Sequence, residues 1–139
     1  MKKRSFLSVV LISLLALSFI VPTASAAAGT YGPFNIRLFN AGDYDAVYVR
    51  LDPGQQTFGI KGLKMYGIHA GENASFKLNI YDSNDNLVAS NQYNSDVNNI
   101  DLGVSNLSPG GTYQVVIEST TNHDMQGGFS IFVYGSAYK

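Results

Sequence analysis

Alternating hydrophobic and polar positions recur along the chain and predict a series of short β-strands. The clearest example is 75–90, SFKLNIYDSNDNLVAS, in which Phe76, Leu78 and Ile80 alternate with polar or mixed neighbours. A period of two is typical of a strand with one buried face. A run of Asp, Ser and Asn follows, and the chain then becomes apolar again. The segment therefore predicts a β-hairpin.

The rest of the chain after residue 26 extends this pattern. The alternation predicts further strands at 36–39, 47–51, 57–68 (as two short strands), 100–104, 113–117 and 129–134. The last of these is apolar on both faces except at Ser130, which is typical of a strand in the middle of its sheet. Residues 27–35 and 119–128 are expected to be irregular, and no segment has the spacing of an amphipathic helix. The pattern predicts an all-β fold: a single antiparallel β-sandwich, jelly-roll-like, of seven to nine strands.

The first 26 residues are expected to be a signal peptide that is cleaved from the folded domain. Residues 2–4 are positively charged, residues 6–21 are almost entirely apolar, and Ala24-Ser25-Ala26 supplies small residues at the cleavage site. The apolar run is shorter than the roughly 20 residues that a membrane-spanning helix needs. We therefore expect cleavage near Ala26 and one domain over 27–139.

Charge and cysteine content narrow the functional classes. Three of the nine Lys and Arg residues lie in the signal peptide and all ten acidic residues lie after it, so residues 27–139 carry a net charge of −4. With no basic cluster in that sequence, neither nucleic acid nor a membrane is an expected partner of the mature form. The chain contains no cysteine. A secreted domain without disulfides is stabilised by packing or by bound ions, and we expect a bacterial source.

Three motifs occur in order within residues 72–135: FKLNIYDSNDNLVAS, LSPGGTYQVVIES and GGFSIFVYG. Together they resemble the bacterial pre-peptidase C-terminal domain, a small β-sandwich or jelly-roll module usually attached to secreted proteases and other exported hydrolases. The resemblance implies a secreted sandwich domain. Some related domains bind calcium at an Asp-rich approach to the first motif, whereas this chain has Glu-Asn-Ala-Ser there. Asn86 stands where the family commonly has glycine, and asparagine tolerates a positive φ better than most residues.

A calcium site is one of two interpretations of the hairpin loop. Asp82, Asn84 and Asn86 match the opening D-x-[DN]-x-[DN] of a calcium-binding loop. An EF-hand loop continues with a glycine and ends with a glutamate, where this chain has Leu87 and Tyr93, so that loop type is excluded. The favoured interpretation is a turn in which these side chains bind the backbone. The alternative is a surface calcium site completed by a distant carboxylate, and no other cofactor is expected.

Catalytic signatures are absent from the sequence. His69 and His123 are the only histidines, and the chain contains neither a G-x-S-x-G nor an H-E-x-x-H motif. We therefore expect a protein that is not an enzyme.

Aromatic residues give a candidate binding surface. Several are expected on the side of a sheet that faces away from the core, where exposed rings can stack on sugars or anchor a protein partner. These residues are Tyr48, Tyr66, Tyr81, Phe132 and Tyr134. Ordinary packing in a two-sheet sandwich is the favoured alternative, and the absence of tryptophan weakens the case for sugar binding.

These observations together predict a secreted, extracellular, non-catalytic β-sandwich with a binding or structural role. The expected partner is a cell-wall polysaccharide or another secreted protein. The alternative is a small secreted effector, toxin-like or protease-inhibitor-like, that acts on other cells or on proteases.

Overall fold

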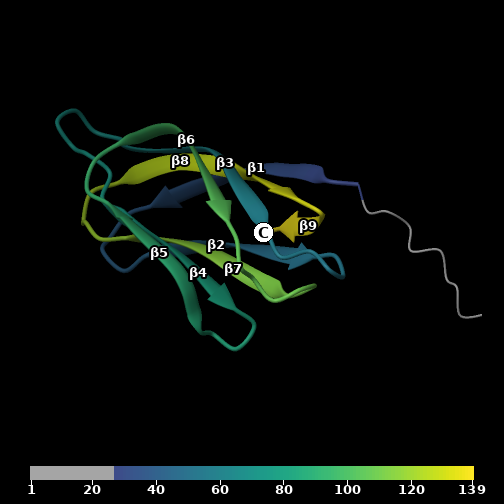
Figure 1. Ribbon diagram of the computed structural model, residues 1–139. Helices are drawn as coiled ribbons and strands as arrows, with labels where there is room; N and C mark the ends of the chain where they lie inside the picture. The colour runs from purple at the N-terminus through teal and green to yellow at the C-terminus, as the bar shows by residue number, and fades with distance from the viewer. Residues whose placement is uncertain (1–26) are drawn as a thin grey trace, which may run out of the picture.

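The structure, a computed structural model, describes residues 27–139 as nine β-strands in two facing layers (Figure 1). The strands are β1 (Gly29–Leu38), β2 (Tyr44–Leu51), β3 (Phe58–Gly67), β4 (Phe76–Asp82), β5 (Leu87–Tyr93), β6 (Val97–Val104), β7 (Thr112–Ser119), β8 (Met125–Val133) and β9 (Gly135–Tyr138). The predicted all-β sandwich is confirmed. Across 27–139 no helix is long and apolar enough to cross a membrane. The predicted signal peptide lies outside the described residues.

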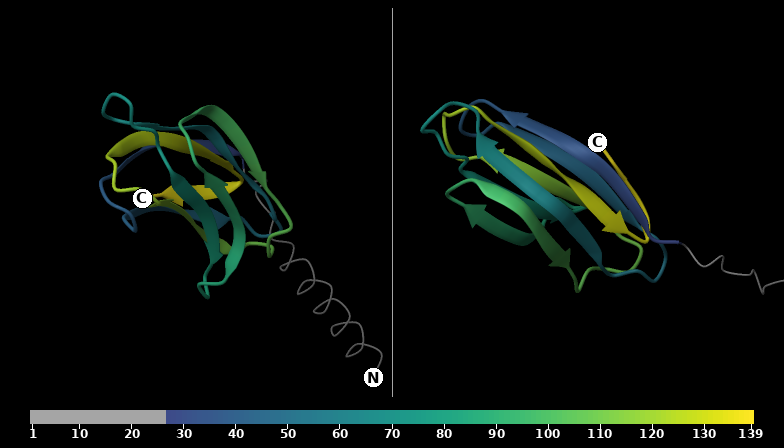
Figure 2. Two further views of the ribbon diagram at one scale, coloured as in Figure 1. Left: turned by 90° about the vertical axis from the view of Figure 1, so that its left-hand side faces the viewer. Right: turned by 90° about the horizontal axis from the view of Figure 1, so that it is seen from above.

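The two sheets are antiparallel throughout. The first sheet has the order β1-β8-β3-β6 and the second has the order β5-β4-β7-β2-β9, and Figure 2 shows the two layers from the end and from above. β8 lies between β1 and β3, so the central position predicted for 129–134 is confirmed. The loop predicted for 119–128 is wrong over its last four residues, because β8 begins at Met125. Gly127 and Gly128 interrupt the alternation there, although their backbone pairs with both neighbouring strands.

The irregular segment expected at 27–35 is also a strand. β1 begins at Gly29 and pairs with β8 from Gly29 opposite Val133 to Leu38 opposite Met125. Pro33 lies where the register shifts, between Tyr31 and Phe34. Proline is tolerated at such a position because β1 is an edge strand, which leaves one row of backbone groups unpaired. The pairing with a strand almost 100 residues away makes this segment regular, and local sequence does not reveal it.

Alternate residues of most strands point into one core between the sheets. The largest fully buried side chains include Phe76, Ile80 and Ile117 from the second sheet and Phe129 and Ile131 from the first. Burying each such side chain stabilises the fold by about 1.5–3 kcal/mol relative to leaving it in water. The alternation therefore fixes which residues remain on the two outer faces.

One lateral side of the sandwich is closed by a single change of sheet. The chain leaves β8 in the first sheet and enters β9 in the second at Gly135, which has φ of +150° and leaves no room for a side chain beside the carbonyl oxygen of Arg50. The Tyr31 hydroxyl donates a hydrogen bond to the Gly135 carbonyl at 2.7 Å, and Asp52 N–H donates one to the Tyr134 carbonyl at 2.9 Å. This crossing ties the two layers together.

The opposite lateral side is open between β5 and β6, the edge strands of the two sheets. A hollow of about 300 Å³ lies there, and its apolar lining includes Ile60, Leu78, Ile80, Val88 and Leu102. The sequence of β5, LVASNQY, carries no charge and no proline. Natural edge strands often carry such residues as protection against pairing with another chain; β5 lacks them, and its only irregularity is the register shift at Val88.

The turn before β7 shows why the LSPGGTY sequence is suited to this fold. The Tyr113 side chain folds back over the turn, where the Ser108 N–H donates a hydrogen bond to its hydroxyl at 2.8 Å. Gly110 has φ of +68°, and the Gly111 N–H donates to the Ser108 carbonyl at 3.2 Å. A side chain on Gly111 would meet the Tyr113 ring at 2.9 Å. The tyrosine therefore holds the turn against the end of the core.

Removing this hydroxyl is expected to lower stability. We expect Tyr113→Phe to reduce the free energy of unfolding by about 1–2 kcal/mol, because the Ser108 N–H loses its partner in a partly buried place. Tyr44→Phe is the matched control, since the Tyr44 side chain is 67% exposed, and it should leave stability within about 0.5 kcal/mol. Urea denaturation of both variants measures the difference, and equal effects would contradict this role for Tyr113.

Candidate binding faces

The loop of the β4–β5 hairpin is organised by the carboxylate of Asp82. Its Oδ1 accepts hydrogen bonds from the backbone N–H groups of Asn84 at 2.8 Å and Asn86 at 3.0 Å, and its Oδ2 accepts one from the Asn86 side-chain amide at 3.1 Å. These bonds, the one from the Asn86 backbone above all, hold the pKa of Asp82 below its usual value. The residue with positive φ is Asp85, at +60°. The expectation that Asn86 takes that position is therefore wrong.

This geometry is the Asx-type turn favoured by the sequence analysis. Both carboxylate oxygens of Asp82 already accept hydrogen bonds within the loop. Within residues 27–139 no group of three or more His, Cys, Asp or Glu residues is arranged to hold a metal ion. A calcium site that uses Asp82, Asn84 and Asn86 together stays a prediction.

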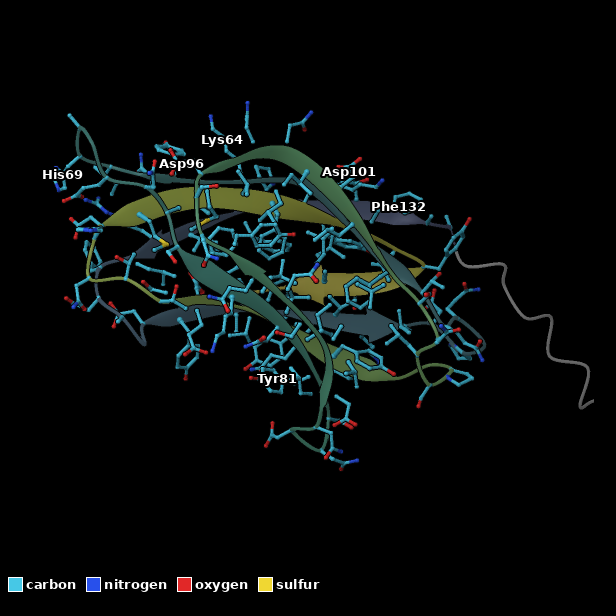
Figure 3. All side chains as sticks on the ribbon, turned by 60° about the vertical axis from the view of Figure 1, so that its left-hand side comes forward. Lys64, His69, Tyr81, Asp96, Asp101 and Phe132 are labelled. Carbon is cyan, nitrogen blue, oxygen red and sulfur yellow. The ribbon has the colours of Figure 1, made fainter. Side chains whose placement is uncertain are left out.

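The predicted aromatic residues divide between the two outer faces of the sandwich. Tyr48 and Tyr81 lie outside the second sheet, because their neighbours Val47, Val49 and Ile80 are buried. Tyr66 and Phe132 lie outside the first sheet by the same alternation. Tyr134 lies at the crossing between the sheets. Figure 3 shows Tyr81 and Phe132 on opposite sides of the molecule. The five residues therefore do not form one surface.

Four tyrosines gather on the outer face of the second sheet, and we call this surface the tyrosine face. It consists of Tyr44, Tyr48, Tyr81 and Tyr138. Tyr44 and Tyr138 are the most exposed of them, at 67% and 53%. Neither position was predicted from the sequence, because Tyr44 precedes the alternating part of β2 and Tyr138 lies beyond the last predicted strand. The spacing of Tyr44 and Tyr138 along the sequence does not indicate that they lie on the same face as Tyr48.

The tyrosine face is built around one row across the sheet. Tyr138 is opposite Tyr48, Tyr48 is opposite Gln114, and Gln114 is opposite Tyr81, so the row crosses β9, β2, β7 and β4. The rings of Tyr48 and Tyr138 are stacked, with centroids 5.5 Å apart and an angle of 17° between their planes. Gln114 Nε2 donates a hydrogen bond to the Tyr48 hydroxyl at 2.9 Å. These contacts orient exposed rings before any ligand arrives.

A shallow hollow accompanies this row. Its volume is about 230 Å³, and it is lined by Tyr44, Tyr81, Gln114, Val116 and Glu118. Val116 is buried although it points outward, because the surrounding side chains cover it. The hollow therefore combines aromatic rings, an amide and a carboxylate on an apolar floor, which is the mixture that binds the apolar face and the hydroxyl groups of a sugar.

Each of the two histidines lies close to a carboxylate at one end of the sandwich. His69 Nε2 is 3.6 Å from Asp124 Oδ2, and His123 Nδ1 is 3.2 Å from Glu72 Oε1. These pairs connect the β3–β4 loop with the β7–β8 loop. Among residues 27–139 neither pair is hydrogen-bonded to a serine or threonine hydroxyl. The arrangement connects loops, and the expectation that the protein is not an enzyme stays a prediction.

Residues 53–127 match the family model of the secretion system C-terminal sorting domain. The match runs from the turn after β2 into β8 and covers more than half of the 139 residues. The chain belongs to this family. A sorting domain of a secretion system belongs to an exported protein, so the family supports the predicted secreted, bacterial β-sandwich. The motifs that resemble the pre-peptidase C-terminal domain fall largely within the matched region, and that resemblance is not confirmed by the match.

Comparison with other proteins adds only distant likenesses. No curated protein matches the chain significantly. Among solved structures, the chain is similar to the Yersinia pseudotuberculosis-derived mitogen, with 10% identity, 77% of this chain and 84% of that chain covered, and a TM-score of 0.41. It is also similar to a family two carbohydrate esterase from Cellvibrio japonicus, with 10% identity, coverage of 81% and 36%, and a TM-score of 0.46. Accessory secretory protein 1, 2 and 3 in Streptococcus pneumoniae has 11% identity, coverage of 86% and 88%, and a TM-score of 0.35. These likenesses carry no functional information.

Proposed function

We propose that this sorting-domain protein is a non-catalytic binding module that acts outside the cell and takes a polysaccharide chain on its tyrosine face. Family membership supports export. The observation that carries the binding role is the row from Tyr138 through Tyr48 to Tyr81, which presents oriented rings on the outside of a rigid sheet. Cell-wall polysaccharide is the ligand class that we propose for this surface.

The proposed binding depends on tyrosine rings that are both exposed to solvent and held in fixed orientations. Strands in one sheet are about 4.8 Å apart, so four neighbouring strands spread the row over roughly 14 Å. That length suits several successive sugar rings of a chain that lies across the strands. The stacked pair and the bond from Gln114 restrict the Tyr48 ring, so little side-chain entropy is lost when a sugar stacks on it.

The test is binding to insoluble cellulose, chitin and purified bacterial cell wall, measured as the fraction of protein that sediments. We expect at least one of these polysaccharides to retain the wild type. A Tyr48→Ala, Tyr81→Ala double variant should bind about tenfold more weakly, because each stacked ring contributes about 0.5–1.5 kcal/mol. Tyr134→Ala is the matched control, since that ring is also exposed but lies off the tyrosine face. Equal retention of the double variant and the wild type would overturn the proposal.

A protein partner is the second candidate, and the edge strand β5 favours it. The strand has an uncharged sequence, and the apolar hollow between β5 and β6 lies beside it. An extended segment of another exported protein could pair with this edge and insert alternate side chains into the hollow. If the double tyrosine variant still binds purified cell wall, the edge of β5 becomes the favoured binding site.

A further inference from the structure

The outer face of the first sheet carries an excess of positive charge in a domain whose net charge is negative. Three of the six basic residues of 27–139 lie there: Arg37 on β1, and Lys61 and Lys64 on β3. Lys61 pairs with Asp101 at 3.3 Å, and Lys64 and Asp101 both lie along this face in Figure 3. Arg37 and Lys64 form no ion pair with a side chain within the described residues. The Arg37 guanidinium lies 5.2 Å from the centroid of the Phe39 ring, a contact that does not neutralise its charge, so two cations on this face have no carboxylate partner among residues 27–139.

The register brings these cations together although they are far apart in sequence. Asn35, Gly128 and Lys64 form one row across β1, β8 and β3, and Arg37, Gln126 and Tyr66 form a parallel row two residues away. Arg37 and Lys64 therefore lie diagonally on either side of β8, with backbones roughly 12 Å apart. A ligand placed over β8 can contact both.

The middle of this face is recessed because the residue there, Gly128, has no side chain. Gly128 contributes no side chain between Asn35 and Lys64, and any Cβ at that position would come within 2.5 Å of the Phe34 carbonyl oxygen. A hollow of about 340 Å³ lies over Gly128 between Asn35, Lys61 and Lys64. A second hollow of about 350 Å³ shares Asn35 and extends toward Arg37 and Gln126. We call this continuous surface the basic groove.

An oriented aromatic ring forms part of the wall of the basic groove. Gln126 Nε2 donates a hydrogen bond to the Tyr66 hydroxyl at 2.7 Å, and the Lys64 ammonium lies 5.2 Å from the centroid of the Tyr66 ring. The contact between ammonium and ring places the charge beside the aromatic surface. Tyr66 and Lys64 therefore lie beside Gly128 in the first hollow, and Gln126 and Arg37 line the second.

We propose that the basic groove binds an acidic saccharide, with a carboxylate of the sugar between Lys64 and Arg37 and the sugar ring against Tyr66. Charge complementarity selects the anion, and the aromatic ring and the amides of Asn35 and Gln126 suit a hydroxylated ring. Three cations on a domain of net charge −4 are too few for a nucleic-acid phosphate backbone or for a lipid surface. The site is on the opposite side of the molecule from the tyrosine face and does not depend on it.

The test is affinity electrophoresis in native gels that contain polygalacturonate, with dextran as the neutral comparison polymer. We expect polygalacturonate, and not dextran, to retard the wild type, and 0.3 M NaCl to weaken the retardation. An Arg37→Ala, Lys64→Ala double variant should bind at least tenfold more weakly.

The matched control is an Arg50→Ala, Lys77→Ala double variant. It removes the same number of positive charges, but from the second sheet, and it should bind polygalacturonate like the wild type. Equal weakening in both double variants would show a general charge effect and overturn the proposal, as would a wild type that polygalacturonate does not retard. The Tyr48→Ala, Tyr81→Ala variant should retain polygalacturonate binding, which separates this site from the proposed function.

Discussion

Replacing Gly127 with alanine is expected to destabilise the domain by about 3 kcal/mol or more. Gly127 lies in β8 between two paired strands, and a Cβ there would overlap the carbonyl oxygen of Lys64 and come within 2.9 Å of the Met65 Cα. Both are backbone atoms of β3, so the overlap is relieved only if the centre of the first sheet shifts. Thermal unfolding should detect a loss of roughly 10–20 °C in Tm.

Gly103→Ala is the control for this prediction. Gly103 also lies in the first sheet, on β6, but a Cβ there would meet no atom within 4 Å. This variant should be as stable as the wild type or more stable by up to about 1 kcal/mol, because alanine restricts the unfolded chain. A Gly127→Ala protein with the same Tm as Gly103→Ala would show that β3 and β8 can separate without cost, which contradicts the packing described above.

Truncation of Phe76 is expected to have an effect of similar size from a different cause. Phe76 in β4 is completely buried and stacks on Tyr93 of β5, with ring centroids 4.9 Å apart. Phe76→Ala should therefore reduce the free energy of unfolding by about 3–5 kcal/mol, through lost burial and the cavity that remains. Because small domains have only about 5–15 kcal/mol in total, urea denaturation should show a midpoint shifted far toward low urea.

The same substitution on an outer face supplies the comparison. Phe132 is 40% exposed outside the first sheet, and Phe132→Ala should change stability much less, by about 1 kcal/mol or under. If the two variants unfold at the same urea concentration, the position of Phe76 at the centre of the core is wrong.

The parts of the fold that were predicted depend on local sequence. The 75–90 hairpin is recognisable because its two strands are neighbours in the chain and its turn residues lie between them. β1 was missed because Gly29–Leu38 is ordered by β8, which begins at Met125. The alternation of hydrophobic and polar residues around Pro33 is too weak to predict a strand when its partner, β8, is unknown.

The candidate surfaces were predictable only in part, for a related reason. Alternation shows that Tyr48, Tyr66 and Tyr81 point away from the core, but it does not show which sheet each one belongs to. Only the strand order places Tyr48 and Tyr81 on one face and Tyr66 on the other. The basic groove could not be predicted from the sequence. Arg37 and Lys64 are 27 positions apart, and they lie near each other only because β1 and β3 both pair with β8.

The central position of β8 also sets the order in which the two sheets can form. Among the strands of residues 27–139, β1 pairs with β8 alone, and β8 lies between β1 and β3. A chain that emerges with its N-terminal end first therefore has the first sheet incomplete until residues 125–133 have appeared. Pairing of distant segments is slow compared with local structure formation. The strands β5, β4, β7 and β2 of the second sheet can pair before that point, so we expect insertion of β8 between β1 and β3 to be the last step in forming the sandwich.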